Sequence, residues 1–252
     1  MDERRFHTPE PVELVVKVPI GDIDVQTVDG EESLITVDGA EKLVELTEVR
    51  QDGDRIVVEL RGKKPFGITI SIGDFSFGNN RLDITARVPH ASAVELASAS
   101  ADAKVRGRVR SLDSKTASGD LRVDADIDGD AAIKTVSGDV RLRRVGGELR
   151  VQSVSGDVTA QYVGSSVAAK SVSGDLRLES VREGEVTAQS VSGDIDVGVA
   201  EGTNLDVDAG SVSGDLSSEV PLGSEPDAVT GDGPLLVVRG KTVSGDFRVF
   251  RG

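Results

Sequence analysis

The residues best placed for chemistry are aspartates that recur at a nearly constant spacing. Ser-Gly-Asp occurs seven times, with its serine at positions 118, 137, 155, 173, 192, 213 and 244, and only the last copy follows a much longer gap. Ser100-Ala101-Asp102 is a degenerate copy before them. If the repeats fold alike, their carboxylates form one stack, which we call the aspartate ladder: Asp102, Asp120, Asp139, Asp157, Asp175, Asp194, Asp215 and Asp246.

Such a ladder has two interpretations. It could bind cations, or each carboxylate could stabilise a tight turn by accepting backbone N–H groups. Like charges about 5 Å apart repel by roughly 1 kcal/mol in a water-like medium. Arginines two residues after several ladder aspartates (Arg122, Arg141, Arg177 and Arg248) offset this repulsion. We favour solvated turn aspartates and keep the cation-binding β-roll as an alternative, although the nonapeptide Gly-Gly-x-Gly-x-Asp turns of calcium rolls are absent.

A second carboxylate cluster lies between two repeats. Residues 124–129 read Asp-Ala-Asp-Ile-Asp-Gly, which matches the first half of a calcium loop, and the candidate ligands are Asp124, Asp126, Asp128 and Asp130. The position of the bidentate Glu is Thr135, and no helical pattern flanks the loop. We therefore expect a bulged corner and no metal or other cofactor, with calcium as the alternative.

Catalytic constellations are scarce, and we expect a protein that is not an enzyme. Cysteine is absent, and the two histidines, His7 and His90, lie outside the repeats. The nucleophile-elbow, zinc-protease, P-loop and dinucleotide motifs are all missing. Pectin-degrading β-helices are the enzymatic alternative. Their clustered carboxylates and sugar platforms have no counterpart here, since the chain has no Asp-Asp pair, no Trp and one tyrosine, Tyr162.

Charge points to the kind of partner. The chain has 29 Lys and Arg against 44 Asp and Glu, a formal net charge of -15, which disfavours nucleic acid and anionic membranes. The segment 183–238 contains 12 carboxylates and no Lys or Arg. We expect it to form an acidic interaction pole for a protein partner of basic character. Its members are Glu183, Glu185, Asp194, Asp196, Glu201, Asp206, Asp208, Asp215 and Glu219.

The apolar spacing predicts the element that carries the ladder. From Asp139 the apolar residues are Val140, Leu142, Val145, Leu149, Val151, Val154 and Val158, spaced 2, 3, 4, 2, 3 and 4. Two nine-residue halves therefore make one period of about 18 residues, each half a short strand followed by a bend. A unit this small must stack on its copies. We predict an all-β fold, a single-stranded parallel β-solenoid.

This interpretation assigns faces to the corner residues. The valine before each Ser-Gly-Asp, such as Val172, should lie in the stacked interior. The serines on either side of it should point outward: Ser153 and Ser155, Ser171 and Ser173, Ser190 and Ser192, Ser211 and Ser213. They would then form hydroxyl ladders that bond to each other and to backbone.

Two regions are predicted along the chain. Residues 1–90 read as an N-terminal β capping region with an excursion at 62–80, and residues 91–252 as the repeat solenoid with an inserted loop at 221–240. Phe247 fills the first inward position of its repeat, so its ring should cover the last layer, with Arg248 and Arg251 protecting that end.

These motifs carry a resemblance. Thr/Ser-Val-Ser-Gly-Asp repeated about 18 residues apart, preceded by a strand block with Val18-Pro19-Ile20-Gly21-Asp22-Ile23 and Arg87-Val88-Pro89, resembles the bacterial β-strand-repeat family described as "putative adhesins". The resemblance covers nearly the whole chain. It implies a β-helical fold and almost no biochemistry.

The sequence thus favours a non-catalytic β-solenoid scaffold or protein-interaction module. The alternatives are a self-assembling filament subunit and a surface adhesin. No stretch approaches about 18 consecutive apolar residues, and no apolar signal region follows Met1–Phe6, so we expect a cytoplasmic protein without a transmembrane segment; an extracellular location stays open. The expected state is a monomer or small homo-oligomer, with filaments as the alternative.

Overall fold

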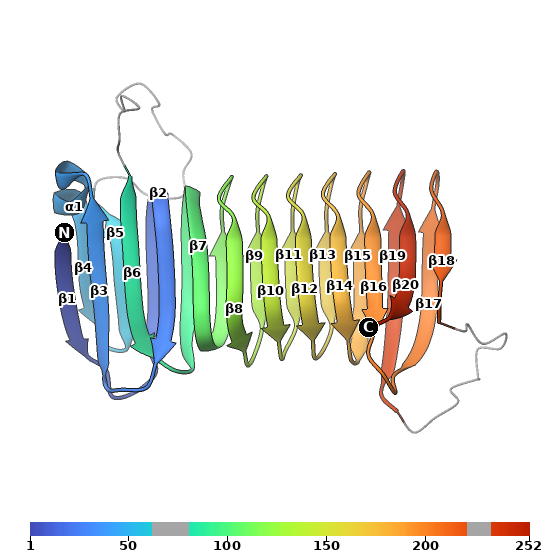
Figure 1. The fold of residues 1–252 in the computed structure, drawn as a ribbon, viewed down its shortest axis with the longest axis horizontal. Coiled ribbons are helices and arrows are strands. Elements are labelled where there is room, and N and C mark those ends of the chain that lie inside the picture. Colours follow the sequence, from blue (N-terminus) through green and yellow to red (C-terminus); the bar gives the residue numbers. More distant parts are fainter. Residues whose placement is uncertain (62–80, 221–232) are drawn as a thin grey trace.

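The computed structural model describes residues 1–61, 81–220 and 233–252, and it is an elongated stack of β-strands (Figure 1). The fold is all-β, with mostly parallel strands in a solenoid-like arrangement and one short helix, α1 (Glu41–Leu46). None of the described residues forms a helix with the length and apolar character needed to cross a bilayer.

The central coils alternate between two sheet faces. One face contains β8 (Leu121–Ile127), β10 (Val140–Val145), β12 (Val158–Val163), β14 (Leu176–Val181) and β16 (Ile195–Val199). The other contains β9 (Ala131–Lys134), β11 (Leu149–Gln152), β13 (Val167–Lys170) and β15 (Gly184–Gln189). Equivalent residues pair in parallel one coil apart, as Val140 does with Val158 and Leu149 with Val167.

The core is the set of inward residues stacked between these faces. Val140, Leu142, Val145, Leu149 and Val151 are all buried, and their equivalents in the neighbouring coils lie above and below them. These aliphatic side chains fill the narrow interior between the two faces.

At the N-terminal end, two long strands run along both faces. β2 (Glu13–Val28) pairs in parallel with β7 (Ser92–Lys115), and also with β5 (Arg55–Leu60) and β6 (Leu82–Pro89). The outermost strands are antiparallel: β1 (Asp2–His7) pairs with β3 (Glu32–Gly39), and β4 (Thr47–Asp52) pairs with β5. The parallel stacking therefore ends here. The predicted excursion at 62–80 lies outside the described residues.

At the C-terminal end, the coils are not in sequence order. β19 (Leu235–Thr242) pairs with both β15 and β17 (Asn204–Ser211), and β20 (Phe247–Arg251) pairs with both β16 and β18 (Leu216–Ser218). The last coil of the sequence, drawn in red in Figure 1, is thus inserted between its two predecessors. We call β19 and β20 the inserted coil.

Two predictions are therefore wrong. The loop predicted over 221–240 is a strand from Leu235 onward, while 221–232 lies outside the described residues. Phe247 does not cover the end of the stack, because it lies between Ile195 and Leu216. Its ring occupies the space beside Gly240, where an added Cβ would lie 2.0 Å from Cε2 of Phe247. The large Phe247 ring fits there because Gly240 has no side chain.

Charge gives a physical reason for the insertion. In sequence order, β17 would stack directly on β15, and Glu185 would face Asp206. The inserted coil places Val237 between these two carboxylates and Arg239 3.1 Å from Glu185. Interposing a basic coil between two acidic ones removes like-charge contacts and adds opposite-charge contacts.

Candidate functional site

The repeated corners form the most regular surface of the molecule. In six corners a hydroxyl residue, a valine, a serine, a glycine and an aspartate lead from one sheet face to the other, as in residues 153–157, and in residues 116–120 Ala117 takes the place of the valine. Ser153 is only 6% exposed; its Oγ donates to the Gly156 carbonyl at 2.8 Å and accepts the Gly156 N–H at 3.1 Å. Thr135 makes the same pair of bonds with Gly138.

The prediction that both serines of each pair point outward is wrong for the first serine. The first serine of each predicted outward pair is withdrawn from the surface, since Ser153 and Ser190 are buried and Ser171 and Ser211 are half-buried. The prediction for its partners is right, since the second serines are exposed: Ser155, Ser173, Ser192 and Ser213. The hydroxyl takes the inward position because it satisfies backbone groups of the glycine, which the bend removes from the sheet ladder.

The valine between the two serines is displaced to the surface. Val172, predicted to be interior, is 47% exposed, and Val154 also lies on the surface. The prediction for this position is therefore wrong in every coil. The exposed valines are Val136, Val154, Val172, Val191, Val243 and Val212, in spatial order, and we call them the valine ridge.

Beyond the glycine, the aspartate ladder connects successive coils. Each backbone N–H donates to Oδ1 of the aspartate one coil earlier in space, at 2.8–3.1 Å, for example from Asp157 to Asp139 and from Asp175 to Asp157. The ladder follows the inserted coil, because Asp246 donates to Asp194 and Asp215 donates to Asp246. The carboxylates thus bond between coils.

Most ladder carboxylates have no cationic partner. Arg141 lies 3.6 Å from Asp139, whereas Asp157, Asp175, Asp194, Asp246 and Asp215 form no ion pair within the described residues. These five line a shallow groove together with Arg177 and Arg248. Both arginines pair outside the ladder, Arg177 with Asp196 at 2.9 Å and Arg248 with Glu219. The groove therefore presents a row of uncompensated negative charge.

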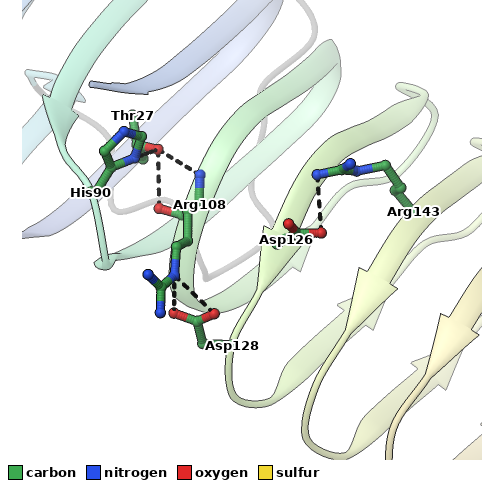
Figure 2. Close-up of polar contacts among 6 residues, drawn as sticks. All are labelled: Thr27, His90, Arg108, Asp126, Asp128 and Arg143. Carbon is green, nitrogen blue, oxygen red and sulfur yellow. Dashed lines mark hydrogen bonds and ion pairs between the residues drawn. The ribbon is translucent and has the colours of Figure 1, made fainter. Parts of the chain in front are cut away.

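The calcium-loop candidates do not converge on one point. Asp124 pairs with Arg122 at 2.8 Å, which lowers the pKa of the Asp124 carboxyl chiefly through that hydrogen bond. Asp126 pairs with Arg143 at 3.0 Å and Asp128 with Arg108 at 2.8 Å (Figure 2). Asp130 accepts the N–H of Glu148 at 2.8 Å. In the described ranges, no three His, Asp or Glu side chains are grouped to hold a metal ion.

We expect the thermal midpoint to be the same in calcium and in a chelator, because arginines already neutralise three of these four carboxylates. A ligand that binds only the native state at about a hundredfold excess over its Kd would add about 2.7 kcal/mol. Differential scanning calorimetry in each solution measures this. A calcium-dependent rise would contradict the expectation and would direct mutation to Asp124, Asp126, Asp128 and Asp130.

The acidic pole differs from its prediction because the inserted coil runs through it. Arg239 pairs with Glu185 and Arg248 with Glu219, and Arg239 is also the strand neighbour of Asp208. A segment that is purely acidic in sequence is therefore interleaved with basic residues in space. The negative charge that stays without a cationic partner lies in the groove lined by the five ladder aspartates, which include Asp194 and Asp215 of the predicted pole.

No sequence motif indicated one polar cluster near the N-terminal end. Nδ1 of His90 lies 2.8 Å from Oγ1 of Thr27 (Figure 2). On the other side of the ring, Oδ1 of Asp29 lies 3.7 Å from Nε2 of His90. A hydroxyl, an imidazole and a carboxylate in a row are the elements of a nucleophilic triad.

The hydrogen bonds of Thr27 assign this cluster a structural role. Thr27 is 3% exposed; its hydroxyl donates to the Arg108 carbonyl at 3.0 Å and accepts the Arg108 N–H at 2.7 Å. The buried hydroxyl therefore bonds two backbone groups of Arg108 as well as Nδ1 of His90, which holds it in place between strands. The cluster joins β2, β6 and β7.

A row of basic residues lies on the other side of the valine ridge from the ladder. Successive coils place Lys115, Lys134, Gln152, Lys170, Gln189 and Lys241 side by side at the end of one sheet face, and we call them the lysine row. Lys134, Lys170 and Lys241 are exposed and form no ion pair within the described ranges. Each corner thus has a cationic flank, an apolar crest and an anionic flank.

Comparison with known proteins identifies the fold more than the chemistry. The family model described as Toastrack DUF4097 matches residues 13–249. A "putative lipid binding protein" from Parabacteroides distasonis superposes with a TM-score of 0.59 and 13% identity, covering 98% of this chain and 96% of that one. A "putative adhesin" from Bacteroides fragilis has a TM-score of 0.43 and 15% identity, covering 98% and 96%. No curated protein matches.

Proposed function

Because the chain belongs to the Toastrack family, and a fold does not specify a function, we propose from its surface that it is a non-catalytic scaffold that binds a basic protein partner along the aspartate ladder. The observation that carries this proposal is the groove of five ladder aspartates, none of which has a cationic partner within the described residues. All of them except Asp215, the last in the stack, use Oδ1 to bond the next coil, which leaves the other oxygen available for a donor.

The geometry favours a scaffold over an enzyme. The ladder carboxylates repeat the same environment in coil after coil, whereas paired catalytic carboxylates take their separate acid and base roles from different environments. The hydroxyl of Thr27, which contacts the His90 imidazole, is committed to backbone bonds. The absence of catalysis and of a cofactor is part of the proposal.

Binding of a decalysine peptide tests the proposal. We expect the triple variant Asp157→Asn, Asp175→Asn, Asp194→Asn to bind at least about tenfold more weakly than the unmodified chain by fluorescence anisotropy. Asparagine keeps the oxygen that accepts the N–H of the next coil, so the stack should persist. Binding should also weaken as salt is raised from about 50 mM to about 500 mM, because the Debye screening length becomes shorter.

A matched control distinguishes the effect of the ladder carboxylates on binding from the effect of net charge. The variant Glu10→Gln, Glu31→Gln, Glu45→Gln removes the same three charges from exposed positions at the far end of the stack. Its affinity should change by less than about threefold. Equal weakening in both triple variants would show a response to net charge alone and would contradict the proposal.

A further inference from the structure

We propose that the valine ridge is the contact surface for a second copy of this chain, packed side by side with both stacks running in the same direction. The inference rests on the proposed function, in which the aspartate ladder binds cationic side chains, and it assigns those side chains to the lysine row of a second copy. In this dimer the lysine row of each copy lies against the ladder of the other.

The first argument is the cost of leaving the ridge uncovered. Its six valines are 44–83% exposed and follow one another along one edge, each corner hydrogen-bonded to the previous one. Because the valine side chains point outward at these corners, burial in the core of the stack does not account for their recurrence there. A contiguous apolar strip on a surface with polar borders is typical of a protein contact.

The second argument is the pattern of charge on the two borders. Along each corner the lysine row lies two residues before the ridge valine and the ladder three residues after it, as in Lys134, Val136 and Asp139. The three free lysines, Lys134, Lys170 and Lys241, are separated from one another by Gln152 and Gln189 in the row. This alternation reduces their mutual repulsion while leaving each available to a partner.

Symmetry then selects one arrangement. A two-fold axis parallel to the stack exchanges the borders, so the lysine row of each copy faces the ladder of its partner on both sides of the ridge. A two-fold axis perpendicular to the stack keeps the borders in place and sets lysines against lysines and aspartates against aspartates. Only the parallel dimer is complementary in charge.

The size of the contact sets its strength. Six coils about 4.8 Å apart give a ridge of roughly 24 Å, and the five residue steps from lysine to aspartate reach at most about 17 Å. The contact is thus on the order of 400 Å² per copy, about half of a standard interface. We therefore expect a weak dimer, with a Kd in the micromolar range or above.

Sedimentation velocity at about 50 mM salt, between about 1 and about 300 µM protein, tests the association. We expect a monomer–dimer equilibrium for the unmodified chain and an increase in Kd of at least about tenfold for Val154→Asp, Val172→Asp. The matched control, Gln51→Asp, Gln161→Asp, adds the same charge at exposed positions away from the ridge and should leave the Kd unchanged within about threefold. A cooperative thermal transition within a few degrees of that of the unmodified chain establishes that each variant is folded.

Cysteine cross-linking tests the direction of packing, and the chain offers a background without native cysteine. In the parallel dimer each ridge residue faces the same residue of the other copy. The Val136→Cys variant should therefore form a disulfide between the two copies under mild oxidation. In an antiparallel dimer, Val136→Cys would cross-link only when mixed with Val212→Cys, because opposite ends of the ridge then meet. That result would overturn the proposed arrangement.

Other occupants of the ridge give different results. Growth beyond a dimer with concentration would indicate end-to-end assembly, and a monomer that co-sediments with phosphatidylcholine vesicles would indicate a lipid surface; either overturns the inference. If decalysine binds through the ladder but the chain stays monomeric at the highest concentration, the inference fails and the proposed function stands. If the ridge dimer forms but the triple Asn variant of the ladder binds decalysine as tightly as the unmodified chain does, the proposed function fails.

Discussion

Replacing Gly156 with alanine is expected to destabilise the stack by about 3 kcal/mol or more, which is among the largest effects a single methyl group can have. A Cβ at this position would lie 2.1 Å from the carbonyl oxygen of Gly138 in the previous coil. Because the neighbouring atom is backbone, the two coils must separate to admit the methyl group, and the hydrogen bonds between them lengthen. Thermal unfolding followed by circular dichroism measures the change.

Gly210→Ala is the matched control for this experiment. Gly210 lies in β17, and a Cβ there meets no atom within 4 Å. The added methyl group should change stability by less than about 1 kcal/mol, since alanine is no worse than glycine in an extended strand. Similar midpoints for the two variants would contradict the close approach of the corner glycines.

The second large effect is expected from two valines three residues apart. Val151 is 2% exposed and Val154 is 44% exposed. We expect Val151→Asp to place a carboxylate between coils and to lower stability by several kcal/mol. Val154→Asp should lower it by less than about 1 kcal/mol, because its side chain already contacts water. Urea unfolding of both variants gives the comparison, and equal shifts would reject the outward position of the ridge.

The sequence allowed the core of the coils to be predicted, because the apolar spacing is regular. Val140, Leu142, Val145, Leu149 and Val151 are inward as expected, since the period of two within a strand assigns alternate residues to opposite faces. The parallel pairing one repeat apart followed from the small size of each unit.

The corner valines could not be placed by the same rule. The spacing counted Val154 as inward because it is apolar, whereas the structure gives the inward position to Ser153. Hydrogen bonding of the Ser153 hydroxyl to Gly156 outweighs the hydrophobicity of a neighbour at the bend. The recurrence of serine or threonine before each valine was the available signal.

The inserted coil was also beyond the reach of local patterns. The long gap between the Ser-Gly-Asp copies at Ser213 and Ser244 is equally consistent with a loop, and sequence order is the ordinary expectation for a solenoid. The signal was the charge contrast between the segment 183–238, which contains no Lys or Arg, and the segment 239–251, which contains four. This charge contrast indicates which strands pair only once the neighbouring strands are known.

The order of the last coils also affects how the protein is made. Strands β19 and β20 leave the ribosome after both of the coils that enclose them, since Leu235 follows Ser218 in the chain. At about 5–20 residues per second, the stretch from Ser218 to Arg251 takes roughly 2–7 s to synthesise, far longer than strand pairing itself. During that interval β17 and β18 have no permanent neighbour. The nascent chain must therefore hold this position open, or pair in sequence order and then exchange, so the register of one end of the molecule is decided only after its final strand has emerged.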